Sequence, residues 1–148
     1  MFDLLLKNGD VYDGSGRVVC GQDIAIQDGM IVDIGKNLTG IAQQTIDASG
    51  LIVSPGFIDM HTHSDFTLIA DGRAESQVHQ GVTTEVIGQC GISCAPVVSK
   101  DSIKHVSPWF TSKAKYKGWL SFSEYLDALD ETTLGVNVMA FVGHGTIH

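Results

Sequence analysis

Apolar and polar positions alternate through the first fifty residues, and short turn sequences divide them into segments. In DIAIQDGMIVDIG, isoleucines stand on both sides of Asp28-Gly29, a dipeptide suited to a type I′ hairpin turn. DGSG at 13–16 and ASG at 48–50 are further turn signals. The pattern predicts a small β segment of short strands and tight turns, spanning residues 1–53.

The pattern changes at Leu51, where LIVSPGFIDMH forms a nearly continuous apolar run. Such a run predicts a strand buried on both faces. Pro55 and Gly56 interrupt it near its start, where a proline harms a strand least. GVTTEVIGQCG at 81–91 and VNVMAFVG at 136–143 predict a second and a third buried strand.

Helix signals separate these strands. AESQVHQ at 74–80 is compatible with a helix, and SFSEYLDALDE at 121–131 has a capping box formed by Ser121 and Glu124. The apolar face predicted for the second helix consists of Phe122, Tyr125, Leu126 and Leu129. A long irregular segment is predicted from Ser93 to Trp119. Strands that alternate with helices indicate an α/β fold with parallel β/α units over residues 54–148.

Polar groups gather where these predicted strands end. Side chains alternate across a strand, so residues of equal parity share a face. The three sets of equal parity are Phe57, Asp59, His61 and His63; Thr84, Val86, Gly88 and Cys90; and Val136, Val138, Ala140 and Val142, which lead to His144. Active sites of β/α barrels and open α/β sheets lie at the carboxyl ends of the strands. We therefore expect the three strand ends to converge on one site.

Imidazole and thiolate are good zinc ligands, and a catalytic zinc needs about three protein ligands and an open position. His61, His63 and Cys90 could supply them, or share them between two metals. Asp59 is placed to orient an imidazole. Asp65 and His144 are candidates for contact with the ligands or the substrate, although His144 could also be merely packed. The competing interpretation is a polar strand end without a metal, with Cys90 a small buried residue.

Composition narrows the possible partners and compartments. The chain has 148 residues, a net charge of −8 and a pI of about 4.9, so duplex nucleic acid or an anionic membrane would be repelled. Five of the seven lysines fall between Lys100 and Lys117, a segment read as a solvated loop in preference to an anion-recruiting rim. Apolar runs are too short for a membrane span, and no signal peptide is evident.

Three cysteines make an odd count without a Cys-x-x-Cys pair, which favours a reduced, cytoplasmic protein. Of these, Cys20 and Cys94 are interpreted as plain core or surface residues. His79 and His105 lie outside any predicted strand end and are interpreted as surface histidines.

The motifs together resemble a known family. PGFIDMHTHSD, GVTTEVIGQCGISCAPV, GWLSFSEYLDAL and NVMAFVGHGTI are similar to the amidohydrolase superfamily, and within it to the D-aminoacylase or N-acyl-D-amino-acid deacylase branch. The first motif is widespread in the superfamily. The second is more selective, because this branch has a metal-binding cysteine in a Gly-Asn-Cys-Gly setting. Gln89 stands here in place of the usual asparagine.

The resemblance implies a metal-dependent hydrolase with a TIM-like β/α barrel and a small β-sandwich. Residues 1–53 would form part of the composite sandwich, and residues 54–148 the first three β/α units. His61 and His63 would be the metal pair of the first strand, and Cys90 the thiolate ligand, to one or two zinc ions. The implied reaction is hydrolysis of an N-acyl-D-amino acid, a small-molecule substrate, to a carboxylate and a D-amino acid.

A barrel of eight such units needs about 250 residues, so the barrel is expected to be incomplete in these residues. The resemblance places two further histidine ligands and the general acid/base aspartate downstream, so this chain alone is expected to be an inactive N-terminal portion that needs the rest of the barrel for closure. Two alternatives remain: a cyclic-amide hydrolase or deaminase of the same superfamily, and a non-catalytic amidohydrolase-like scaffold. The histidine pair and the cysteine argue against a scaffold.

Overall fold

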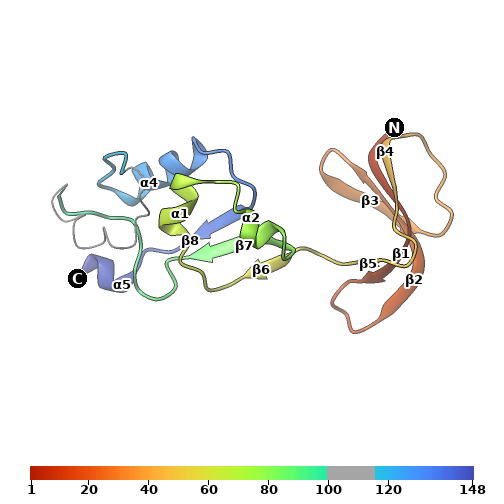
Figure 1. Cartoon of the computed structure of the whole chain (residues 1–148), viewed down its shortest axis with the longest axis horizontal. Helices are drawn as coiled ribbons and strands as arrows, with labels where there is room; N and C mark the ends of the chain where they lie inside the picture. The colour runs from red at the N-terminus through yellow and green to blue at the C-terminus, as the bar shows by residue number, and fades with distance from the viewer. Residues whose placement is uncertain (100–115) are drawn as a thin grey trace. The chain divides into compact units, whose positions relative to one another are not determined.

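The computed structural model describes residues 1–99 and 116–148. It divides the chain into two compact units, Met1–Pro55 and Gly56–His148 (Figure 1). The part of the predicted irregular segment that is described, 93–99 and 116–119, contains neither helix nor strand. His105 and four of the five clustered lysines lie outside the described residues. Within the described ranges, no helix is both long and apolar enough to cross a membrane.

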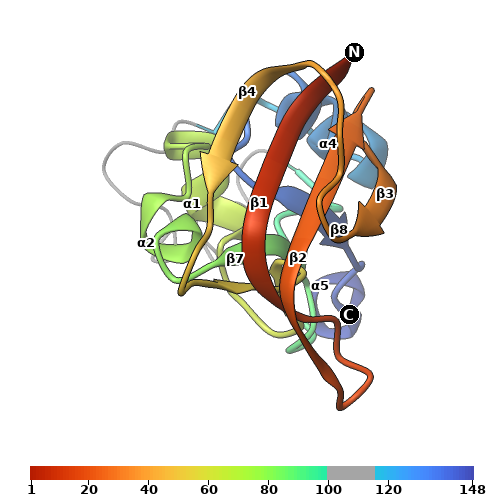
Figure 2. The same ribbon diagram turned by 90° about the vertical axis from the view of Figure 1, so that its right-hand side faces the viewer.

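The first unit is one mixed β-sheet. Its strands are β1 (Phe2–Tyr12), β2 (Val18–Gln27), β3 (Met30–Gly35), β4 (Ala42–Asp47) and β5 (Ile52–Val53). The order across the sheet is β3-β2-β1-β4 (Figure 2). β5 also pairs with β1. The pairs β1–β2 and β2–β3 are antiparallel, whereas β4 and β5 run parallel to β1.

The hairpin predicted at Asp28-Gly29 is confirmed. β2 and β3 are joined by these two residues alone, and Gln27 pairs with Met30 across the turn. Asp28 has φ 52° and Gly29 has φ 73°, so both central residues are left-handed. A type I′ turn requires this conformation, and an aspartate followed by a glycine adopts it at the lowest cost.

The single long strand predicted from Leu51 is wrong: the apolar run contains two strands in two different sheets. β5 (Ile52–Val53) belongs to the first unit, and β6 (Phe57–Asp59) to the second. Pro55 has no amide hydrogen for a ladder, so pairing stops there. Burial on both faces is also not observed, because the side chains of Phe57 and Ile58 are 60% and 59% exposed.

The second unit contains a three-stranded parallel sheet in the order β6-β7-β8, with β7 at Val82–Ile87 and β8 at Asn137–Ala140. The helices α1 (Asp65–Ala70) and α2 (Glu75–Val78) lie between β6 and β7, α4 (Phe122–Asp130) lies between β7 and β8, and α5 (His144–Ile147) follows β8 (Figure 1). The predicted β/α alternation is therefore confirmed over these residues. α1 was not predicted, because polar residues at its start resemble a loop.

The capping box of α4 forms as predicted. The Ser121 hydroxyl accepts from the Glu124 backbone N–H (3.2 Å), and the Glu124 carboxylate accepts from the Ser121 N–H (2.8 Å). The buried face of the helix consists of Tyr125, Ala128 and Leu129, so Leu126, which is exposed, was wrongly assigned to it. The core combines α1, α4, the end of β7 and the segments beside them: Phe66, Leu68, Ile69, Ile87, Cys94, Ala95, Val97, Trp119, Tyr125, Ala128, Leu129 and Val136.

The register of the parallel sheet corrects the parity argument. Glu85 pairs with Asp59 on one side and with Val138 on the other. Directly paired residues share a face, so Asp59 lies on the face opposite to Thr84 and Val86. Equal parity within each strand therefore does not place the predicted sets of β6 and β7 on a common face of the sheet. The cause is a register shift in the β6–β7 pair: Phe57 pairs with Val82, but Ile58 pairs with Thr84 and Asp59 with Glu85.

Candidate metal centre

His61 and His63 lie just beyond β6, in the loop that leads into α1. The loop is fixed at two points: the His61 backbone N–H donates to Asp59 Oδ1 (3.1 Å), and the Thr62 N–H donates to the carbonyl of Val86 in β7 (3.4 Å). Because the strand ends at Asp59, loop geometry rather than strand parity sets the direction of the two imidazoles.

Cys90 lies in the loop after β7, which ends at Ile87. Gly88 has φ 79°, and a Cβ atom there would stand 2.1 Å from the carbonyl oxygen of Phe141. Glycine is therefore required at this turn, both for its left-handed conformation and for the close approach of the chain that follows β8. The turn directs Cys90 toward the histidine loop.

The two loops bring the predicted ligands together. One ligand atom from each of His61, His63 and Cys90 lies within 4.8 Å of the others, and His61 Nε2 contacts Cys90 Sγ. The two imidazole rings are 5.7 Å apart between centroids and inclined at 52°. All three residues are exposed. Two imidazole nitrogens and one sulfur are a donor set that suits zinc, so these residues fit the metal that the sequence predicted.

His144 is not part of this group among the described residues. It begins α5, is exposed, and its ring lies 4.8 Å from that of His148. The Gly145 N–H donates to the Gly91 carbonyl (2.8 Å), so the loop of His144 is joined to the loop of Cys90. Contact with the substrate stays a prediction for this residue.

Asp59 and Asp65 occupy different environments. Asp59 contacts the backbone of His61, whereas the sequence predicted a carboxylate aligned with an imidazole; that role stays a prediction. Asp65 is buried at the start of α1, and Tyr125 donates its hydroxyl to the Asp65 carbonyl (2.9 Å). Burial raises the pKa of the Asp65 carboxyl to about 6; nearby Glu85 adds to this and His63 opposes it.

The sequence profile of the amidohydrolase family matches residues 44–148. The chain belongs to this family. A D-aminoacylase of Alcaligenes xylosoxydans xylosoxydans is 38% identical over 151 residues, which cover 99% of this chain and 30% of that protein. The resemblance to the D-aminoacylase branch is thus confirmed.

Solved amidohydrolase structures agree. A D-aminoacylase structure matches with a TM-score of 0.87 and 34% identity, over 99% of this chain and 31% of the other. The N-acyl-D-glutamate deacylase from Bordetella bronchiseptica, solved with zinc and a phosphonate that mimics the tetrahedral intermediate, gives 0.85 and 32% over 99% of this chain and 30% of that one. The chain spans less than a third of the length of these relatives.

Sequence reasoning missed three buried polar residues in or next to the segments that carry the candidate ligands. Ser64 and Glu85 form a hydrogen bond, with the Ser64 hydroxyl donating to Glu85 Oε2. Ser93 accepts from the Gly143 N–H (2.9 Å) through its hydroxyl, which also donates to the Ala95 carbonyl (2.6 Å). Serines are too common to single out, but a glutamate inside the predicted buried strand VTTEVI was a signal that the sequence offered.

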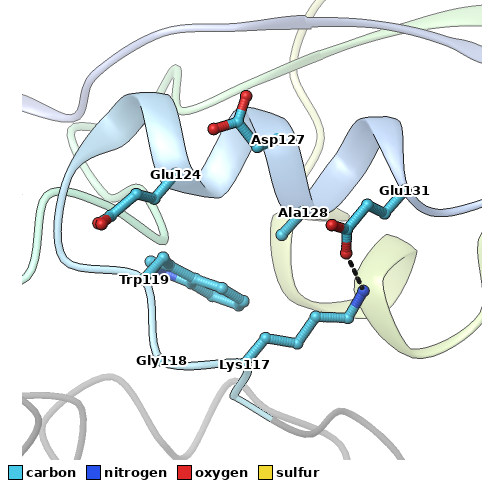
Figure 3. A pocket seen from close by; sticks show the side chains of 7 residues that line it. All are labelled: Lys117, Gly118, Trp119, Glu124, Asp127, Ala128 and Glu131. Atoms are coloured by element: carbon cyan, nitrogen blue, oxygen red, sulfur yellow. Dashed lines mark ion pairs between the residues drawn. The ribbon is translucent and has the colours of Figure 1, made fainter.

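A cavity of about 280 Å³ lies apart from the ligand loops, along α4 (Figure 3). Three of its charged groups have local partners: Lys117 Nζ stands 3.7 Å from Glu131 Oε2, and the Glu124 carboxylate caps the helix. Lys117 is the described end of the predicted basic segment. Among the described residues, the group that could hold a metal is His61, His63 and Cys90, in the histidine and cysteine loops.

Proposed function

We propose that this protein hydrolyses the amide bond of N-acyl-D-amino acids with the help of zinc, releasing a carboxylate and a D-amino acid. The observation that carries the proposal is the grouping of His61, His63 and Cys90, whose ligand atoms lie within 4.8 Å of one another. A thiolate beside a His-x-His pair is the donor set expected for this branch. The similarity to D-aminoacylase and to N-acyl-D-glutamate deacylase supports the choice of substrate class.

The fold proposal has two parts. Residues 54–148 would be the first three β/α units of a metal-dependent hydrolase barrel, and residues 1–53 part of a composite β-sandwich. The parallel order β6-β7-β8 with intervening helices supports the first part, and the TM-score of 0.87 to D-aminoacylase supports both. Further units would then close the barrel and supply the general acid/base aspartate.

His61, His63 and Cys90 would hold the metal, as one ion or as part of a two-ion site. Zinc, when bound, supplies a Lewis acid that polarises the amide carbonyl and makes water more acidic. The protein's own contribution is to hold the ligands in place. Asp59 fixes the backbone of His61, and Ser93 joins the segment after Cys90 to Gly143. Such fixed surroundings keep an imidazole or a thiolate oriented before the metal arrives.

The direct test is an assay of the protein as its gene encodes it, not of residues 1–148 alone, on N-acetyl-D-amino acids, their L enantiomers and cyclic amides, with zinc content measured in parallel. We expect zinc-dependent release of acetate and D-amino acid, loss of activity after chelation, and recovery when zinc is returned. Turnover confined to cyclic amides would favour the cyclic-amide hydrolase alternative. A protein that binds zinc and turns over none of these substrates would favour the scaffold.

A further inference from the structure

Glu85 is a carboxylate at a position that would suit an apolar side chain. It lies in the middle of β7 and is 0% exposed. On its face of the sheet, Ile87 belongs to the hydrophobic core and Val138, its partner in β8, packs against that core. Burying a carboxylate opposes folding, and an apolar residue of similar volume often gives a more stable protein. Stability alone therefore does not account for this residue.

Two further carboxyl groups near Glu85 increase the free-energy cost of burying it. Asp59 is the cross-strand partner of Glu85, and the buried carboxyl of Asp65 is close enough for the two to interact electrostatically. Among the described residues, Glu85 Oε1 and both carboxylate oxygens of Asp65 have no hydrogen-bond partner. The other oxygen of Glu85 accepts a hydrogen bond from the hydroxyl of Ser64.

Ser64 occupies the N-cap position of α1, yet its hydroxyl makes no capping hydrogen bond. Serine at this position ordinarily accepts from a backbone N–H of the first turn, which stabilises the helix. Here the Ser64 hydroxyl donates to Glu85 instead, while its carbonyl accepts the Leu68 N–H (2.8 Å) of α1. The helix still begins after Ser64, but the serine side chain contacts β7 instead of capping α1.

The two residues that flank His63 in the sequence both contact β7. On one side, the Thr62 N–H donates to the Val86 carbonyl; on the other, the Ser64 hydroxyl donates to Glu85. Glu85 and Val86 are consecutive residues of β7, the strand that leads to Cys90. The neighbours of His63 are therefore held by the strand that leads to Cys90. One of the two contacts is a backbone hydrogen bond, and the other is the side-chain hydrogen bond between Ser64 and Glu85.

We propose that Glu85 is a positioning residue of the metal centre, which acts through Ser64 to hold His63 at a fixed place relative to Cys90. The proposal rests on the assignment of His61, His63 and Cys90 as zinc ligands. It explains why a buried carboxylate occupies an apolar strand and why the N-cap serine does not cap its helix. Glu85 is fully buried and its printed contact with the ligand loop is through Ser64, so its proposed role is to position a ligand and not to take part in the chemistry.

The test separates metal affinity from stability in the protein as its gene encodes it. Glu85→Leu removes the acceptor and the buried charge, Ser64→Ala removes the donor, and Glu85→Gln keeps an oxygen that can accept from Ser64. Leu129→Ala is the matched control, because it opens a cavity in the same core far along the chain from both ligand loops. Each variant is measured for its zinc dissociation constant, its unfolding temperature without metal, and its cobalt(II) absorption spectrum.

We expect Glu85→Leu and Ser64→Ala to weaken zinc binding by about 10- to 100-fold, the range found when groups that orient metal ligands are removed. Their cobalt spectra should shift in the ligand-field bands while the sulfur-to-cobalt band persists. Glu85→Leu should unfold at or above the temperature of the parent, and Glu85→Gln should retain parent-like zinc affinity. Leu129→Ala should unfold at a lower temperature yet bind zinc as the parent does.

Parent-like zinc affinity in Glu85→Leu would overturn the positioning role, as would an equal loss of affinity in Leu129→Ala. If Glu85→Leu does not fold, Ser64→Ala decides the matter by the same measurements. These failures differ from failure of the proposed function, in which the parent protein itself binds no zinc or hydrolyses no N-acyl-D-amino acid.

Discussion

At the scale of single residues, Cys90 and Cys94 have opposite environments, and this contrast makes Cys90 the candidate zinc ligand. Cys90 is exposed beside two imidazoles, whereas Cys94 is fully buried and burial raises the pKa of its thiol. Cys90→Ala should remove most of the bound zinc and most of the hydrolytic activity. Cys94→Ala and Cys20→Ala should retain zinc, as measured by elemental analysis. Full zinc retention in Cys90→Ala would refute the assignment.

Asp23 gives a prediction about pH in the first unit. Its buried carboxylate accepts from Lys7 Nζ (2.5 Å) and from the Asn8 and Leu38 N–H groups (both 2.9 Å). The Lys7 hydrogen bond and these backbone donors lower the pKa of Asp23. A carboxyl with a lowered folded pKa contributes stability above its unfolded pKa, about 3.9, and this stability is lost as the pH falls through the folded pKa.

Asp23→Asn should therefore unfold at a lower temperature than the parent near neutral pH, with a loss of about 3 kcal/mol of unfolding free energy, because Lys7 loses its charged partner and keeps the Leu38 carbonyl (3.2 Å). The difference between the two proteins should shrink as the pH falls below about 4. Thermal unfolding followed across this range is the measurement. A difference that stays constant with pH would show that the charge of Asp23 does not stabilise the unit.

At the scale of elements, the local sequence signal at the start of α4 was sufficient to predict where the helix begins. Its capping box forms as the sequence predicts, so Ser121→Ala should cost about 1 kcal/mol of unfolding free energy. Ser123→Ala, an exposed change within the same helix, is the control and should stay within about 0.5 kcal/mol of the parent. Chemical denaturation of both variants measures the difference. Equal effects would mean that the cap is not what stabilises the start of α4.

For β5, β6 and β7, the local sequence was not sufficient to predict the strand boundaries and pairing. The apolar run from Leu51 gave no sign that Pro55 separates two sheets, since either side alone resembles a strand. The relative faces of β6 and β7 depend on a register shift that only pairing reveals. The grouping of His61, His63 and Cys90 was nevertheless predicted, because β/α topology brings the ends of successive strands together whichever face their residues occupy. The roles of Ser64 and Ser93 were not predicted, because their hydrogen-bond partners Glu85 and Gly143 are distant in the sequence.

At the scale of the whole molecule, the parallel sheet has two unpaired edges among the described residues, β6 and β8. Both carry exposed apolar side chains: Phe57, Ile58 and Met139 are 57% to 60% exposed. Such edges promote association between chains. Residues 1–148 expressed alone should therefore self-associate and show no deacylase activity, by size-exclusion chromatography and assay. Met139→Lys should reduce the association; a monomer that turns over substrate would contradict this expectation.

Zinc K-edge X-ray absorption on the zinc-loaded protein tests the metal centre most directly. The predicted shell contains at least one sulfur at about 2.3 Å and imidazole nitrogens at about 2.0–2.1 Å. The sulfur contribution should vanish in Cys90→Ala and persist in Cys94→Ala. A zinc shell in the parent protein without sulfur, or one whose sulfur survives the loss of Cys90, would contradict the assignment of His61, His63 and Cys90 as the ligands.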